Sequence, residues 1–436
     1  MASPLVVRPA LSPAELREHM DGYVQVAQSF SPDPLPEDMA QRRLHRVTTL
    51  PGYRPEQVRS AYRDEKPLGG YRLDERLLRV GSARLATGCI GGVYTRLDAR
   101  NQGVASALMH DAIAYAQAHD YPLLLLDGIP KFYYRYGFCD VYDLSTQELD
   151  HQAILAQPAS SYTVRLATQD DAASLLALYV RNFGPYTGSF ERSIKQQMHW
   201  MQHVDAEKLL LASDPSGQVR GYLFLAGAQR GGSLFPTSTQ LGELVVDDWP
   251  AAVALLQYHV RLLEGQDPSV ISLYNIPPTS PVMRWMVEKL EVVDVSTLDW
   301  PTFAWAVREQ SFHHRYAGWM ARLVSLSALT RAMLPEWQAR WQRSLAHWSG
   351  DVTLSVGDEA FTLRIAGTNL RLLETPDLST DALSLTPQAF IQAVFGYAPI
   401  VSEIQQHERS LPDDLATVLT ILFPSGQTWI PTSDWF

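Results

Sequence analysis

The alternation of hydrophobic and polar positions over the first 140 residues predicts a mixed α+β fold. A short strand over 5–10 precedes an amphipathic helix over 12–30, where Ser12 is a suitable N-cap and Glu15 follows it by three residues. The continuation predicts strands over 71–88, 89–95 and 121–128, a helix from 104 to about 119, and a short helix in 131–138 that ends at Gly137. Residues 31–60 are rich in proline, and we expect them to be irregular.

The segment over about 161–305 repeats this order of elements. Residues 162–184 have the strand, linker and helix pattern of residues 5–30. A hairpin over 208–227, a strand over 242–247, a helix over 249–265 and a strand over 270–277 follow. The repetition predicts a second copy of the same fold.

The last 120 or so residues have a different pattern. We expect a helix over 316–333 and then three strands, over 352–358, 360–367 and 370–375. Helices over 386–397 and 411–423 complete a separate α+β domain.

Composition narrows the class of protein. A chain of 436 residues with 46% hydrophobic and 19% charged residues is globular and long enough for about three domains. Its net charge of −11 argues against binding to nucleic acid and favours attraction of cationic small molecules. With two cysteines, Cys89 and Cys139, we expect no disulfide framework and a cytoplasmic location. We see no signal peptide pattern at the start, and the longest apolar runs are too short to cross a membrane.

A glycine stands where the helix at 104 begins, in the stretch RNQGVA over 100–105. The first amides of a helix lack intrahelical partners and carry partial positive charge, so phosphate oxygens bind there. Gly103 would let the backbone approach a phosphate closely, and Arg100 would bind it with two hydrogen bonds. The stretch therefore predicts a diphosphate site, although six residues alone are equally compatible with an ordinary helix start that contains glycine.

Two patterns in the correct order resemble a known family. Arg-x-x-Gly-x-Ala between a strand and a helix, followed by Phe-Tyr-x-x-x-Gly-Phe over 132–138, resembles the GNAT family of N-acetyltransferases. Over the whole chain the resemblance is to the Eis (enhanced intracellular survival) type, and GWMARLVSL, ILFPSG and the terminal DWF resemble its third domain. It implies a catalytic GNAT domain over 1–158, a degenerate GNAT copy over 159–308 and a sterol-carrier-protein-like domain over 309–436. In the second copy, residues 247–252 (DDWPAA) stand where the first has the glycine loop, as expected if one copy binds the cofactor.

The resemblance also implies the site residues. Acetyl-CoA would be the cosubstrate, held along its length by Gly92, Val93, Tyr94, Arg100, Asn101, Gln102, Gly103, Val104, Ala105, Gly128 and Ile129. Tyr133 would be the acid that protonates the departing thiolate, and the terminal carboxylate of Phe436 would be the base. A phenol has an ordinary pKa near 10 and an α-carboxyl one of about 3.3–3.7, so both groups need help from their surroundings. The residues alone also allow a core aromatic role for Tyr133 and a hydrophobic tail that seals the third domain for Phe436.

The resulting expectation is an acetyl-CoA-dependent N-acetyltransferase that acts on a primary amine of a cationic small molecule or of lysine. The family's kinds of substrate include aminoglycosides, and its members are often hexameric. We expect no metal, because His313 and His314 have no third ligand at a suitable spacing. Two alternatives stay open: a carrier of apolar ligands through the third domain, and a regulatory module that binds acetyl-CoA without turnover. The glycine loop and Tyr133 favour the enzyme over the carrier, which needs neither.

Overall fold

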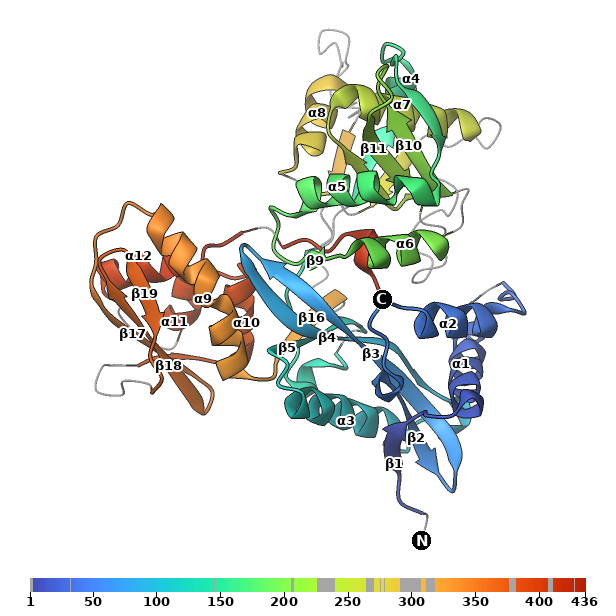
Figure 1. Cartoon of the computed structure of the whole chain (residues 1–436). Helices are drawn as coiled ribbons and strands as arrows, with labels where there is room; N and C mark the ends of the chain where they lie inside the picture. Colours follow the sequence, from blue (N-terminus) through green and yellow to red (C-terminus); the bar gives the residue numbers. More distant parts are fainter. Residues whose placement is uncertain are drawn as a thin grey trace, which may run out of the picture.

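Helices and mixed sheets alternate along the chain in the computed structural model (Figure 1), which confirms the predicted α+β class. It describes all residues except 1–2, 32, 130, 144–145, 205–207, 226–239, 264–269, 275, 278, 291–306, 311–317, 376–381, 407–410 and 427. None of the described helices has the length and apolar character needed to cross a bilayer. The tandem arrangement of two GNAT copies and a sterol-carrier-like domain stays a prediction.

The first sheet has eight strands in the order β1-β2-β3-β4-β5-β16-β6, and β9 pairs with β3 beside this path. The strands are β1 (Val6–Pro9), β2 (Val58–Arg63), β3 (Lys66–Val80), β4 (Ala83–Thr95), β5 (Leu123–Gly128), β6 (Cys139–Asp140), β9 (Phe190–Glu191) and β16 (Gly318–Leu323). The strands β4 and β5 are parallel, and their pairing runs from Thr87 with Leu123 to Ile90 with Leu126. Beyond Ile90, β4 continues to Thr95 without pairing to β5, so the two strands diverge there.

Helices cover both faces of this sheet. The helix α1 (Pro13–Gln28) and its neighbour α2 (Met39–Thr48) lie on one face and α3 (Val104–Ala118) lies on the other. The predicted cap of α1 is confirmed, because the Ser12 hydroxyl accepts from the Glu15 amide at 3.1 Å and the Glu15 carboxylate accepts from the Ser12 amide at 3.1 Å. The expectation that 31–60 is irregular was wrong for α2, because the prolines of this region flank a ten-residue run that contains neither proline nor glycine.

The second segment has the elements that the repeat predicts. Its sheet has the order β13-β11-β10-β8, and a further four-stranded sheet has the order β12-β14-β7-β15. These strands are β7 (Thr146–Asp150), β8 (Thr163–Leu166), β10 (Leu209–Ser213), β11 (Val219–Phe224), β12 (Gln240–Leu241), β13 (Glu243–Val246), β14 (Val270–Tyr274) and β15 (Val307–Gln310). The helices are α4 (His151–Leu155), α5 (Ala172–Phe183), α6 (Ile194–Gln202), α7 (Trp249–Leu262) and α8 (Pro281–Leu290). The antiparallel succession β8, β10, β11, β13 has the same order as β1, β2, β3, β4.

The third segment has its own sheet, ordered β19-β18-β17-β20. Its elements are α9 (Leu326–Arg343), β17 (Gly350–Val356), β18 (Glu359–Ala366), β19 (Asn369–Leu372), β20 (Leu383–Leu385), α10 (Pro387–Phe395), α11 (Ile400–Gln405) and α12 (Asp413–Leu422). The helix predicted over 316–333 was wrong in its first half. Residues 318–323 form β16, because this run completes the first sheet, and Ser325 then caps α9 through the Ala328 amide.

Two strands cross from one segment to the sheet of another. The strand β16, near the start of the third segment, lies between β5 and β6 of the first sheet. The strand β7 follows the first sheet in sequence but pairs with β14 and β15. The sheets therefore interlock across the predicted boundaries at 158 and 308, and the predicted division into domains stays a prediction.

Candidate active site

The divergence of β4 and β5 opens the first sheet at one place. Gly92, two residues beyond the last paired residue Ile90, has a left-handed backbone with φ of +62°. This bend interrupts the pairing of β4 with β3 near Gly70 and Arg72. The backbone of 92–94 therefore borders the opening. An extended ligand that pairs like a strand needs backbone groups in this position.

The start of α3 lies just past the end of β4. Gly103 is the N-cap of α3 with φ of +81° and ψ of +1°, and no side chain caps the helix. A Cβ at Gly103 would meet nothing within 4 Å, so the left-handed backbone, and not crowding by the protein, requires glycine here. The first amides of α3 are thus open at an exposed turn, which fits the binding of a diphosphate.

The side chains of the turn over 100–104 differ in what they offer to a phosphate. The Arg100 guanidinium is exposed and lies 5.4 Å from the Phe30 ring centroid. The Gln102 amide donates to the Asp98 carbonyl and accepts from Arg63, so it holds the loop together. Val104 is buried in the core. The charge available to a phosphate at this turn comes from Arg100.

Gly128 and Ile129, which were also predicted to contact acetyl-CoA, lie at the end of β5 and not on β4 or at the start of α3. Gly128 pairs with Gly318 of β16, and a Cβ there would lie 2.8 Å from the Met320 sulfur. Close packing against β16 therefore accounts for this glycine. Ile129 is 61% exposed.

Tyr133 lies after β5, just before the short helix η3 (Tyr134–Tyr136) that ends at Gly137, as predicted. It is 6% exposed and belongs to the hydrophobic cluster that contains Ile90, Leu126 and Val104, which places it at the divergence on the α3 side of the sheet. Burial, together with the charge of Asp127, raises the pKa of its phenol to about 12. Its hydroxyl makes no hydrogen bond with any residue the structure describes.

The chain end reaches the same strand from another direction. A Cβ at Gly91 would lie 3.2 Å from the terminal carbon of Phe436 and 3.3 Å from its oxygen. The Phe436 ring packs edge to face against Trp319 at 5.0 Å and Phe190 at 6.4 Å between ring centroids. The terminal carboxyl group therefore stands against β4, one residue beyond the last β4–β5 pair.

Buried polar contacts fix this tail in place. Asp434 is 1% exposed and forms an ion pair with Arg192, whose Nη2 lies 2.6 Å from Oδ1. Its other oxygen accepts from the Tyr179 hydroxyl at 2.6 Å and from the Phe190 amide at 3.2 Å. Burial disfavours the charged guanidinium, but the combined attraction of Asp434, Tyr179 and Glu243 raises the pKa of Arg192.

A second contact lies one residue earlier. The Ser433 amide donates to Glu243 at 2.9 Å, and the Tyr222 hydroxyl donates to the same carboxylate at 2.5 Å. Burial raises the pKa of Glu243. The second segment thus holds the tail that reaches the first sheet (Figure 1).

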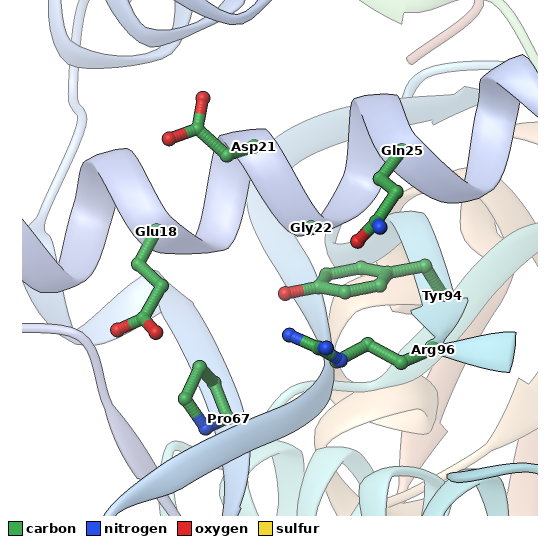
Figure 2. A pocket seen from close by; sticks show the side chains of 7 residues that line it. All are labelled: Glu18, Asp21, Gly22, Gln25, Pro67, Tyr94 and Arg96. Atoms are coloured by element: carbon green, nitrogen blue, oxygen red, sulfur yellow. The ribbon is translucent and has the colours of Figure 1, made fainter. Parts of the chain in front are cut away.

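Two hollows lie near these elements. One, shown in Figure 2, lies between α1 and the adjoining ends of β3 and β4, and its lining includes Glu18 and Gln25 of α1 together with Tyr94 and Arg96. Tyr94, one of its lining residues, belongs to the part of β4 that no longer pairs with β5. The other lies beside Asp434 and Trp435 and extends from β3 to α2 and α6.

The glycine turn, Tyr133 and Phe436 were predicted site residues, and their roles stay predictions. The sequence did not single out Arg192 or Tyr179, which hold Asp434, or Arg76, which donates to the Asp434 carbonyl. These three are isolated polar residues that form no motif. Cys89 and Cys139 are free and buried. No group of three metal-ligating side chains occurs in the described residues, and His313 and His314 lie outside them.

Comparison with known proteins agrees with this geometry. Residues 17–140 match the family model described as an acetyltransferase (GNAT) domain. A search of curated proteins found no match.

Solved structures share the fold over the whole chain. A probable N-acyltransferase from Enterococcus faecalis is 15% identical with a TM-score of 0.69, and the alignment covers 99% of this chain and all of that one. A GCN5-related N-acetyltransferase from Anabaena variabilis has 16% identity, a TM-score of 0.66 and the same coverage. Eis1 from Mycobacterium abscessus is 18% identical with a TM-score of 0.60, again with 99% and 100% coverage. The family match and the shared fold together support a GNAT acetyltransferase domain built around β4, β5 and α3.

Proposed function

We propose that the protein transfers an acetyl group from acetyl-CoA to a primary amine where β4 and β5 diverge. The observation that carries this proposal is the position of the chain end, whose carboxyl carbon would be 3.2 Å from a Cβ at Gly91. A carboxylate placed at the opening of a GNAT-type sheet can hold and deprotonate an amine.

The chain offers a seat for acetyl-CoA along β4 and α3. The open amides after Gly103, with Arg100 beside them, would bind the diphosphate, and the backbone of Gly92, Val93 and Tyr94 would hold the pantetheine arm. When bound, acetyl-CoA supplies the activated acetyl thioester. Asn101, with φ of +60°, shapes the turn, while Gly128 and Ile129 would border the arm.

The Phe436 carboxylate would orient the amine and accept its proton, directly or through water. An α-carboxyl group is ordinarily a weak base, with a pKa of about 3.3–3.7. The rings of Phe190 and Trp319 pack against the Phe436 ring and hold the chain end against β4.

Tyr133 would stabilise the sulfur as it leaves. Its phenol, with a pKa of about 12, stays protonated at neutral pH. A thiol has an ordinary pKa of about 8.5, so complete proton transfer from this phenol is uphill. We therefore assign Tyr133 a hydrogen bond that strengthens as negative charge develops on sulfur.

The test follows release of coenzyme A thiol with a panel of amines that includes kanamycin and a lysine peptide. Removal of the Tyr133 hydroxyl in Tyr133→Phe should lower kcat about hundredfold with an unchanged Kd for coenzyme A. The matched control is Tyr134→Phe, because the Tyr134 hydroxyl bonds to Asp140 at 2.8 Å. An equal loss in both variants would contradict the role of Tyr133.

A chain lengthened by one glycine after Phe436 moves the carboxylate and retains every side chain. We expect kcat to fall about hundredfold while the melting temperature and the Kd of coenzyme A stay unchanged. A wild-type rate in this variant would remove the chain end from the mechanism.

A carrier of apolar ligands has less support. In the third segment, the rings of Trp337 and Phe361 stack at 5.7 Å, and Phe390 and Phe423 pack at 6.0 Å. These side chains are almost fully buried and occupy the interior that a carrier would need for its ligand. An aminoglycoside or lysine acceptor, the cytoplasmic location and the hexamer follow from the sequence resemblance and from charge, and they stay predictions.

A further inference from the structure

A cavity beside the chain end has an apolar wall. Six apolar residues line it: Val47, Leu50, Pro51, Phe190, Trp200 and Trp435. They come from the end of α2 and the segment after it, from β9 and α6, and from the tail. An acceptor that binds here with its amine toward Phe436 would bury an apolar or aromatic body.

The acidic side chains at this cavity are already neutralised. Asp74 pairs with Arg72 at 2.8 Å and Asp434 pairs with Arg192 at 2.6 Å. Glu75 pairs with Arg54 at 3.0 Å, and Glu191 pairs with Arg84. Little acidic charge is left to attract a polycationic acceptor into this cavity.

Two of the basic residues that line the cavity, Arg72 and Arg192, form the ion pairs just described. Arg76 differs from them. Its Nη1 donates to the carbonyl of Asp434 at 2.8 Å, and its guanidinium lies 5.2 Å from the ring centroids of both Phe190 and Phe436. No described acidic group forms an ion pair with Arg76, which keeps four further N–H donors. A half-buried guanidinium held between two aromatic rings is pre-organised to bind a carboxylate.

We propose that the acceptor is an amino acid with an apolar side chain, whose carboxylate binds Arg76 while its amine faces the Phe436 carboxylate. The inference depends on the proposed acetyl transfer and specifies its substrate class. The amine nitrogen forms the C–N bond as the thioester C–S bond breaks. One proton passes from nitrogen toward Phe436, and the sulfur leaves as coenzyme A and takes up a proton.

The first test compares acceptors that differ in one group. L-tryptophan and tryptamine, and L-phenylalanine and phenethylamine, are matched pairs with and without the carboxylate. We expect kcat/KM of the wild-type protein to be about ten- to hundredfold higher for each amino acid, as measured by thiol release and by mass of the N-acetyl product. Equal values within each pair, or a preference for the decarboxylated amine or for kanamycin, would overturn this inference and leave the acetyl transfer in place. No acetylation of any amine would contradict the proposed function itself.

The second test removes the proposed contact. Arg76→Gln should lower kcat/KM for L-tryptophan about ten- to hundredfold, mainly through KM, and lower it much less for tryptamine, which has no carboxylate. Arg76→Lys should restore part of the loss, because it keeps the charge without the planar fork. An equal loss for both acceptors would assign Arg76 to the tail alone and overturn the inference. Arg331→Gln is the matched control, because Arg331 is an exposed arginine on α9 that lies outside the cavity.

Discussion

Two helices of this protein follow corresponding strands but begin in opposite ways. The helix α3 begins at Gly103 with a left-handed residue and no side-chain cap. The helix α7 begins at Asp248, whose carboxylate accepts from the Ala251 amide at 2.9 Å and from the Tyr162 hydroxyl at 3.0 Å. The neighbouring Asp247 pairs with Arg181 at 2.6 Å.

The two helices therefore differ in whether their first amides are available to a ligand. Those of α3 are open, whereas a side chain of the protein already caps α7. A carboxylate cap satisfies the first amides of α7 and places negative charge where a phosphate would have to bind. The start of α3 has neither, and its left-handed glycine leaves the first amides without a side-chain partner. A diphosphate would supply the missing partners at α3, whereas α7 already has them from its own cap.

The largest effect should come from giving α3 the acidic start of α7. Gly103→Asp places a non-glycine residue at φ of +81° and adds a negative charge beside the diphosphate. We expect the Kd of coenzyme A, measured by calorimetry, to rise about hundredfold or more. Gly217→Asp is the control, because Gly217 is an exposed turn glycine with φ of +85° in the β10–β11 hairpin. A Kd that rises equally in the control would refute the assignment of the site to α3.

A smaller effect should follow the loss of the positive charge beside α3. Arg100→Gln removes the exposed guanidinium, and we expect coenzyme A binding to weaken about tenfold, with a smaller dependence of Kd on salt. Arg181→Gln makes the corresponding change beside α7 and should leave the Kd unchanged. Similar values for the two variants would mean that both helix starts behave alike.

The smallest effect concerns stability alone. Asp248→Ala removes the cap of α7, and we expect the free energy of unfolding in urea to fall by about 1 kcal/mol. Coenzyme A should bind this variant with wild-type affinity. Weaker binding after this change would show that the second segment takes part in the cofactor site.

Local patterns in the sequence identified most elements of the fold. The capping box at Ser12, the apolar face of α3 and the buried run of β5 each involve residues close together in the chain. The error at 318–323 has a tertiary cause. An apolar run of this length fits a strand or a helix, and the free edge of β5, almost two hundred residues earlier, decides between them.

In the candidate site too, the parts made of neighbouring residues were predictable and the parts made by distant residues were not. The turn at Gly103 is visible in six consecutive residues, whereas the ion pair of Arg192 with Asp434 joins residues 242 positions apart. The aromatic end of the chain allowed a tail that packs on the protein, but it did not indicate that Tyr179 and Glu243 would hold that tail. Such contacts depend on how the segments pack together, and the spacing of residues in the sequence does not predict that packing.

The place of β16 between β5 and β6 also affects biosynthesis. Residues 123–128 leave the ribosome long before residues 318–323, so the edge of β5 lacks its partner while most of the second segment is still being translated. An unpaired strand edge is prone to join other chains. The nascent protein therefore depends on rapid completion of translation, or on chaperones, to protect that edge until its partner strand arrives.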